Sequence, residues 1–239
     1  MLSFLKNHPF AVEAFFDRSL VLTFAAPKEA LEGFIPPCLR LDTFEERWGF
    51  LALAMVQTSG LRPKGFPPFL GSDFFLTGYR IFTRFTTEKG RNLRGLYILQ
   101  SETDKRRMEF LGNVFTHYRY AFSDIRHSEN IIQSTRSGLL IETMDGDILP
   151  EGSPFHDWKN ARKFAGPLPF TFTYLPKQRA VLIIEGVREN WTPEPIIVKK
   201  YCAPFIDGLK INGLRLAGAF TVENIPYQWK KGRIERWIP

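Results

Sequence analysis

The stretch "DFFLTGYRIFTRFTTEKGRNLRGLYILQSET", residues 73–103, predicts a β-hairpin. Two runs rich in β-branched and aromatic residues, 73–87 and 94–103, flank the turn-forming segment TTEKGRN. Gly90 stands at the tight position of this turn. Two antiparallel strands that follow each other along the chain are therefore expected here, and much of the remaining sequence has the same character.

Strand-like segments dominate the chain on both sides of this hairpin. They are bounded by Gly, Pro or charged turns and comprise residues 19–26, 48–58, 138–144, 169–175, 180–187 and 194–205. The segment YLPKQRAV (174–181) predicts a second turn, with Pro176 at an early turn position. Three short helices are expected between them, within residues 26–37, 104–112 and 152–167. Their expected boundary residues are Pro27, Asp104, Ser153 and Pro154 at the starts, and Gly33, Gly112 and Gly166-Pro167 at the ends. The sequence therefore predicts one α+β domain over residues 1–239, a mainly antiparallel, barrel-like sheet with a few short covering helices.

Composition and charge favour a globular protein with a sizeable core. The chain of 239 residues is 44% hydrophobic, with 23 Phe, and only 24% of its residues are charged. No apolar run reaches the ~20 residues that span a bilayer, and the first residues do not resemble a signal peptide. We therefore expect a cytoplasmic protein with no membrane partner. The net charge of +7 comes from scattered residues, so nucleic-acid binding is not expected, and a basic surface that binds nucleic acid or membrane is the weakest alternative.

Sequence motifs for cofactors and metals are absent. The chain has no GxxxxGK[ST], GxGxxG, GxSxG or HExxH pattern. Its two cysteines and four histidines lie far apart, which is unfavourable for a zinc site or a disulfide framework. We predict no cofactor and no metal, and the sequence leaves open whether the chain forms a homo-oligomer.

Two charged residues interrupt strands that are otherwise apolar. Arg80 lies within FFLTGYRIF, and Glu185 lies within AVLIIEGV. Because side chains alternate between the faces of a strand, both faces around Glu185 are largely apolar, and we expect both residues to be shielded from water. A buried charge costs several kcal/mol unless it is paired. The two residues therefore either hold the sheet together through an ion pair or line a closed cavity.

Several segments resemble the acetoacetate decarboxylase-like proteins, specifically their branch of unknown function. The resemblance rests on "LTFAAPKEALEGFIPPCLRLDTFEERWGFLALAMVQTSGLRPKGFP" (22–67), "SPFHDWKNARKFAGPLPFTFTY" (153–174), "ENWTPEPIIVKK" (189–200) and "IPYQWKKG" (225–232). It implies a curved, barrel-like antiparallel sheet around a mostly apolar pocket.

The same resemblance implies that the reactive amine of the family is missing. In acetoacetate decarboxylases, a pattern like G-R-E-x-x-G-x-P-K ends in the lysine that forms a Schiff base, and a second lysine follows. Aligned on Gly112, this chain keeps Glu109 but has Val114, Phe115 and Thr116 at the Pro and the two Lys positions. Phe115 has no nucleophilic group, so Schiff-base chemistry would need another lysine, for which Lys199 and Lys200 are the candidates.

We therefore expect an internal pocket for a small anionic or carbonyl-containing organic molecule, in a protein that is not a Schiff-base decarboxylase. If residues 113–119 form a strand, one of its faces carries the ligand-binding candidates Asn113, Phe115, His117 and Arg119. The competing outcome is that this face points to solvent and that Val114, Thr116 and Tyr118 fill the interior. A lyase-like or decarboxylase-like enzyme is the alternative; in it Glu109 or Glu185 acts as acid or base, and Arg80 or Arg119 binds a carboxylate.

Overall fold

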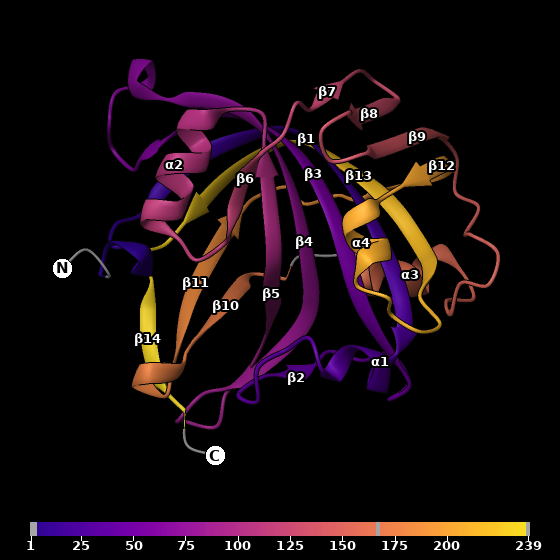
Figure 1. Cartoon of the computed structure of the whole chain (residues 1–239), viewed down its shortest axis with the longest axis horizontal. Coiled ribbons are helices and arrows are strands. Elements are labelled where there is room, and N and C mark those ends of the chain that lie inside the picture. Colours follow the sequence, from indigo (N-terminus) through magenta and orange to yellow (C-terminus); the bar gives the residue numbers. More distant parts are fainter. Residues whose placement is uncertain (1–3, 166–167, 238–239) are drawn as a thin grey trace.

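The structure is a computed structural model that describes residues 4–165 and 168–237 (Figure 1). Its helices are α1 (Lys28–Glu32), α2 (Arg106–Phe115), α3 (Trp158–Ala165) and α4 (Pro204–Gly208), with 3-10 turns η1 (Leu5–Asn7), η2 (Pro68–Leu70) and η3 (Pro176–Gln178). Its strands are β1 (Val12–Pro27), β2 (Arg40–Leu41), β3 (Trp48–Pro63), β4 (Ser72–Thr86), β5 (Asn92–Thr103), β6 (Tyr120–Phe122), β7 (Arg126–His127), β8 (Ile131–Ser134), β9 (Leu139–Asp145), β10 (Phe170–Leu175), β11 (Ala180–Arg188), β12 (Glu194–Cys202), β13 (Arg215–Trp229) and β14 (Arg233–Arg236).

One mainly antiparallel sheet organises the described residues, as the sequence predicts. Its strand order is β14-β11-β10-β5-β4-β3-β1-β13-β12-β9-β8-β7, with β2 paired to β4 and β6 paired to β5. The pairings of β5 with β10 and with β6 are parallel. The strands β11 and β13 also pair over a short stretch, which curls the sheet into a barrel-like form rather than a closed barrel (Figure 1).

The curled sheet buries both of its faces. Leu51, Leu53 and Met55 of β3 point to the outer face, where α1, α4 and the strands β8 and β9 cover them. Phe50, Ala52 and Ala54 alternate with these residues and point to the inner face. A strand that is buried on both faces must be apolar at almost every position, which explains the continuous hydrophobic run WGFLALAMV.

Aromatic side chains fill one end of the inner face. Phe50 packs against Phe155 and Phe164, with ring centroids 5.5 and 4.8 Å apart. The small residues Ala52 and Ala54 leave room for these rings on the face that α3 covers. We call Phe50, Phe82, Phe155 and Phe164 the aromatic plug; it closes this end of the interior and leaves the other end, beneath α2, to a pocket.

Both turns that the sequence predicts are confirmed. Thr86 ends β4 and Asn92 begins β5, and Gly90 between them has the positive φ of 75° that favours glycine. The second predicted turn joins β10 to β11 through η3, which begins at Pro176.

The predicted ends of two helices are wrong. Gly112 does not end α2, which continues to Phe115, and Asp104 accepts a hydrogen bond from the Phe75 amide instead of capping the helix. Ser153 likewise does not cap α3, because Asp157 accepts the bond from the Asn160 amide and the helix begins at Trp158. The predicted stop at Gly166-Pro167 lies outside the described residues.

A buried carboxylate joins the chain after β2 to β4 and β5, at the ends of these strands that lie away from the pocket. Asp42 is fully buried, and its two oxygens accept hydrogen bonds from Arg84 of β4 and Arg94 of β5, each at 2.7 Å. Its backbone amide donates to Phe82 of β4. The buried charge is thus compensated by two guanidinium groups, the arrangement that a buried carboxylate needs.

Within the two described ranges, no helix is both long enough and apolar enough to cross a membrane.

We predict that Asp42→Asn lowers the free energy of unfolding by about 2 kcal/mol, because a neutral amide cannot accept charge-assisted hydrogen bonds from both guanidinium groups. Urea denaturation of the purified variant measures the change. Asp147→Asn is the matched control, since Asp147 is exposed. Equal stability of the two variants would show that Asp42 does not hold these strands.

Candidate functional site

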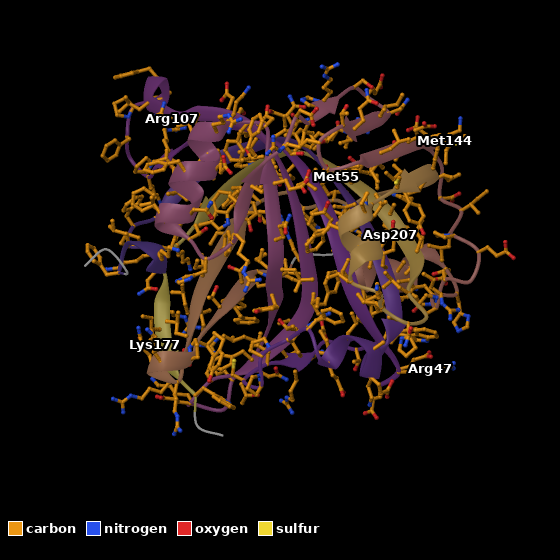
Figure 2. The ribbon with its side chains drawn as sticks, viewed as in Figure 1. Arg47, Met55, Arg107, Met144, Lys177 and Asp207 are labelled. Carbon is orange, nitrogen blue, oxygen red and sulfur yellow. The ribbon has the colours of Figure 1, made fainter. Side chains whose placement is uncertain are left out.

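A pocket of about 460 Å³ lies between α2 and the end of the curled sheet. The helix turns Met108, Leu111, Gly112 and Phe115 toward it, a spacing that places these residues on one helical face. The opposite walls are largely apolar and include Val12, Leu61, Phe74, Leu76 and Trp229. Lys105 and Arg107, at the start of α2, also border the pocket, and Figure 2 marks Arg107 beside that end of the helix.

Five polar side chains meet in the interior around this pocket. We call Arg80, Tyr118, Tyr120, Arg188 and Tyr227 the inner polar cluster. Tyr118 and Tyr120 line the pocket directly. Arg80 lies on β4, whereas Arg188 and Tyr227 lie on β11 and β13, strands that do not neighbour β4. Side chains from these strands can approach one another only across the inside of the curled sheet.

Hydrogen bonds fix part of the inner polar cluster. The Tyr118 hydroxyl lies 2.7 Å from the Thr171 hydroxyl, and Nη1 of Arg188 donates to the Tyr227 hydroxyl at 3.2 Å. The Arg188 guanidinium also stacks on Trp191, 4.7 Å from the ring centroid. Tyr227 packs against Trp229, which lines the pocket, so the cluster borders the pocket through Trp229, Tyr118 and Tyr120.

Three glycines provide the space that the cluster occupies. A Cβ atom at Gly78 would lie 2.9 Å from Nε of Arg80, because this side chain folds back along β4 over the glycine. Leu76 and Phe74, the next residues on the same face, line the pocket, so the guanidinium of Arg80 is directed toward the pocket. A Cβ atom at Gly112 would overlap the Tyr120 ring, and one at Gly186 would overlap the Tyr227 hydroxyl.

The two guanidinium groups have unsatisfied donors. Nε of Arg80 and Nη2 of Arg188 are buried without a hydrogen-bond partner. Among the residues described, neither arginine forms an ion pair with a carboxylate. Burial lowers the pKa of both arginines, but a guanidinium stays charged in proteins. The interior therefore holds two positive charges without a counter-ion.

The tyrosines of the cluster cannot neutralise these charges. Burial raises the pKa of Tyr120 to about 12, although the nearby Arg80 acts in the opposite direction. Burial also raises the pKa of Tyr118. Both phenols are therefore neutral at physiological pH and can donate a hydrogen bond to a ligand.

His8 is a pocket residue that the sequence did not single out. Its side chain is 6% exposed, lines the pocket, and has no hydrogen-bond partner at Nε2. Backbone bonds hold it in place, because its amide donates to the Phe115 carbonyl and its carbonyl accepts from Gly232. Burial lowers the pKa of His8 from 6.5 to about 4, so the imidazole is neutral at pH 7 and can exchange a proton or hydrogen bond with a ligand.

Of the seven residues that the sequence proposes for the site, Arg80 and Phe115 lie in the interior and at the pocket, respectively. Arg80 is on a strand in the interior, and Phe115 lines the pocket. Asn113 lies beside the pocket and holds the chain after α2, since its side chain exchanges two hydrogen bonds with the backbone of Tyr120 at 2.8 and 2.9 Å. Glu109 is half-buried on α2 and does not line the pocket.

Residues 113–119 do not form the strand on which the placement of His117 and Arg119 depended, and these two side chains do not line the pocket. Helix α2 continues to Phe115, so the alternation of a strand does not apply there. After the helix, Thr116, Tyr118 and Tyr120 line the pocket instead. His117 lies 3.4 Å from Asn7 through its Nε2 atom, and Arg119 is exposed with a positive φ of 55°.

Glu185 is not shielded from water, contrary to the expectation. Its side chain is 36% exposed and forms a 2.8 Å ion pair with Lys230. The neighbour Gly186 faces inward against Tyr227, so Glu185 is on the outer face of β11. The two lysines considered as substitutes for the missing amine, Lys199 and Lys200, are exposed on β12 and do not line the pocket.

Sequence reasoning missed Tyr120, Arg188 and Tyr227, and it placed Tyr118 in the interior only as the competing outcome. One signal for Arg188 is present in the sequence: Gly-Tyr-Arg at 78–80 and Gly-Val-Arg at 186–188 share the pattern Gly-x-Arg within a strand. In both cases the arginine shares the inner face with a glycine, which leaves room beside it. For metals, no group of three His, Cys, Asp or Glu residues gathers within the part of the chain that the structure describes.

Sequence comparison identifies a family but no curated relative. A family model named DUF2071, "Uncharacterized conserved protein", matches residues 14–164. No curated protein matches the chain.

Several solved structures share the fold. The acetoacetate decarboxylase of Legionella pneumophila is 12% identical with a TM-score of 0.56, and the match covers 95% of this chain and 88% of that one. An acetoacetate decarboxylase-like enzyme from Sphingomonas wittichii RW1 is 12% identical with a TM-score of 0.52, covering 98% and 94%. The enduracididine biosynthesis enzyme MppR complexed with pyruvate is 11% identical with a TM-score of 0.54, covering 95% and 90%. These likenesses concern the fold alone, and they confirm the predicted fold class.

We predict that His8 takes up its proton near pH 4, which NMR of the imidazole resonance can follow, with His8→Gln to assign the signal. A folded-state pKa below the unfolded value means that the folded protein binds the proton less tightly. The contribution of neutral His8 to the free energy of unfolding is present above pH ~6.5 and is lost as the pH falls toward 4. The loss is about 1.4 kcal/mol for each unit by which the folded-state pKa lies below the unfolded-state pKa. His8→Gln should therefore show a shallower loss of stability in acid, and titration of His8 near 6.5 would contradict its burial.

Proposed function

Because the chain belongs to the DUF2071 family of uncharacterized conserved proteins and shares the acetoacetate decarboxylase-like fold, we propose that it binds a small organic anion in the pocket beneath α2, without a Schiff-base lysine. The observation that carries the proposal is the guanidinium of Arg80, which is buried with an unsatisfied Nε–H and lies on the strand face whose next residues, Leu76 and Phe74, form apolar walls of the pocket.

The cost of burying Arg80 supports a ligand as its partner. A buried guanidinium without a counter-ion destabilises a protein by several kcal/mol, and replacing it with an apolar side chain of similar volume is often stabilising. A carboxylate can accept the free Nε–H together with hydrogen bonds from the neighbouring phenols of Tyr118 and Tyr120. Binding of an anion would therefore offset the cost.

The walls of the pocket indicate the rest of the ligand. Val12, Leu61, Phe74, Leu76, Met108 and Leu111 form an apolar lining, which suits a hydrocarbon or aromatic body rather than a sugar. MppR, which shares the fold, has been solved with pyruvate, a small 2-oxo carboxylate. The proposed ligand thus has an apolar body and an anionic end close to Arg80.

The identity of residue 115 supports binding without a covalent intermediate. Phe115 lines the pocket and packs edge-on against Phe10, with ring centroids 5.3 Å apart. Lys105, the lysine that borders the pocket, is exposed and forms an ion pair with Asp104 at 3.3 Å. An amine that forms a Schiff base must be neutral to attack a carbonyl, which burial favours and a nearby carboxylate opposes.

We predict that Arg80→Met abolishes binding of hexanoate and butylmalonate, measured by isothermal titration calorimetry, while raising the free energy of unfolding of the ligand-free protein by about 1 kcal/mol or more. The matched control is Arg84→Met on the same strand, which should keep binding but lower stability, because Arg84 pairs with Asp42. Undiminished binding by Arg80→Met would contradict the proposal, as would failure of the wild-type protein to bind hexanoate, butylmalonate or pentyl phosphate.

We predict that acetoacetate and borohydride leave no covalent adduct on the wild-type protein, as judged from its intact mass. The expected reason is that no lysine of the pocket has the buried amine that the reaction requires. An acetoacetate decarboxylase treated in parallel is the positive control. A stoichiometric adduct on Lys105, Lys199 or Lys200 would overturn the prediction.

A further inference from the structure

The second arginine of the inner polar cluster extends the proposed function. Arg188 lies on β11, which β10 and β5 separate from β4 in the sheet order, but it shares the inner face with Arg80. Its Nη1 donates to the Tyr227 hydroxyl at 3.2 Å, and its Nη2 is buried without a partner. Its guanidinium lies 4.7 Å from the Trp191 centroid and 5.4 Å from the Tyr227 centroid, so packing holds its orientation.

Hydrogen-bond donors greatly outnumber acceptors in this region. Three buried nitrogen donors lack a partner: Nε of Arg80, Nη2 of Arg188 and Nε1 of Trp191. Trp191 and the two arginines have no acceptor atom in their side chains, and buried donors are almost always satisfied. A ligand that fills this space must therefore supply several acceptor oxygens.

The net charge of the inner polar cluster indicates how many negative charges the ligand carries. The two guanidinium groups carry two positive charges, and burial keeps Tyr118 and Tyr120 neutral by raising the pKa of both phenols. Across the described part of the chain, no carboxylate pairs with either of them. A single carboxylate would leave one positive charge uncompensated in the interior, where that costs most.

We infer that the ligand carries two negative charges close together at its polar end, and that Arg80 and Arg188 bind this end jointly. A substituted malonate has two carboxylates on one carbon, and a phosphate monoester has two charged oxygens on one phosphorus. This inference rests on the proposed function, because it concerns the same pocket. Arg188 donates to the Tyr227 hydroxyl, and Tyr227 and Arg188 lie close enough to Arg80 to act on the pKa of its guanidinium, which favours two charges close together over charges at opposite ends of a chain. The apolar body of the ligand extends past Tyr118 and Tyr120 into the pocket beneath α2.

The test compares ligands that share one tail and differ in their charged end. Butylmalonate is hexanoate with a second carboxylate on the same carbon, and pentyl phosphate carries a dianionic phosphate on a similar tail. Calorimetric titration of the wild-type protein at pH 8 should give an affinity for butylmalonate or pentyl phosphate that is about tenfold or more above the affinity for hexanoate. The reason is that hexanoate lacks the second charge and therefore cannot accept charged hydrogen bonds from both guanidinium groups. Preference for butylmalonate over pentyl phosphate, or the reverse, separates dicarboxylate from phosphate ligands.

Arg188→Gln tests the role of the second guanidinium. This variant should lose most of the preference for the dianions, so that the ratio of its affinities for butylmalonate and hexanoate falls toward one. Arg236→Gln is the matched control: it removes one positive charge from an exposed position on β14 and should keep the preference. Thermal melting of each variant shows whether it is folded, and the comparison of ligands on the wild-type protein does not depend on any variant.

The outcomes separate this inference from the proposed function. Equal affinities for hexanoate and the dianions, within about twofold, would refute the inference and leave the proposed function intact. A preference that persists in Arg188→Gln would also refute it. If the wild-type protein binds none of the three compounds, the proposed function fails and the inference fails with it.

Discussion

The curled sheet must bury both of its faces, and the rest of the structure depends on this constraint. The outer face is covered by α1, α4 and the strands that follow β6, in the usual manner of a sheet in a globular protein. The inner face has no second sheet to pack against, so side chains have to fill the space that the curl encloses. At one end the aromatic plug fills it, with alanines on β3 making room for the rings. At the other end the filling is incomplete, and this leaves the pocket beneath α2.

The inner polar cluster lies between the aromatic plug and the pocket. Arg80 lies two residues before Phe82 of the aromatic plug on β4, so both side chains are on the same face. The Arg80 side chain folds over Gly78 toward the pocket. It thereby marks the boundary between packed core and cavity. An apolar residue at this position would complete the core at lower cost, because a buried and unpaired guanidinium is destabilising. Sites that bind or react often retain such unfavourable groups, since the ligand supplies the missing partner.

Helix α2 and the chain that follows it determine which side chains line the pocket on the side opposite the sheet. Its apolar face places Met108, Leu111 and Phe115 in the pocket wall, and Asn113 fastens the following chain by bonding to the Tyr120 backbone. This connection lets Tyr118 and Tyr120 turn inward while His117 and Arg119 turn away. The N-terminal segment adds His8 from a distant part of the sequence, held by the carbonyl of the last helical residue. The site is thus assembled from at least three separate stretches of chain around one helix.

The sequence by itself determined the strands, the two turns and the fold class, because these follow from local composition: β-branched and aromatic runs, Gly90 at a tight turn and Pro176 before another. It also identified Arg80, since a charge within an apolar strand needs a partner or a cavity whatever the fold. The same argument was wrong for Glu185, because only the pairing of β11 with β13 decides that Gly186 and Arg188 face inward and Glu185 faces Lys230. Only the tertiary structure decided where α2 ends, because packing over the pocket extends it past Gly112. Only the tertiary structure brought Arg188, Tyr227 and His8 to Arg80 and Phe115, because strands far apart in sequence meet there when the sheet curls, and local sequence does not encode that meeting.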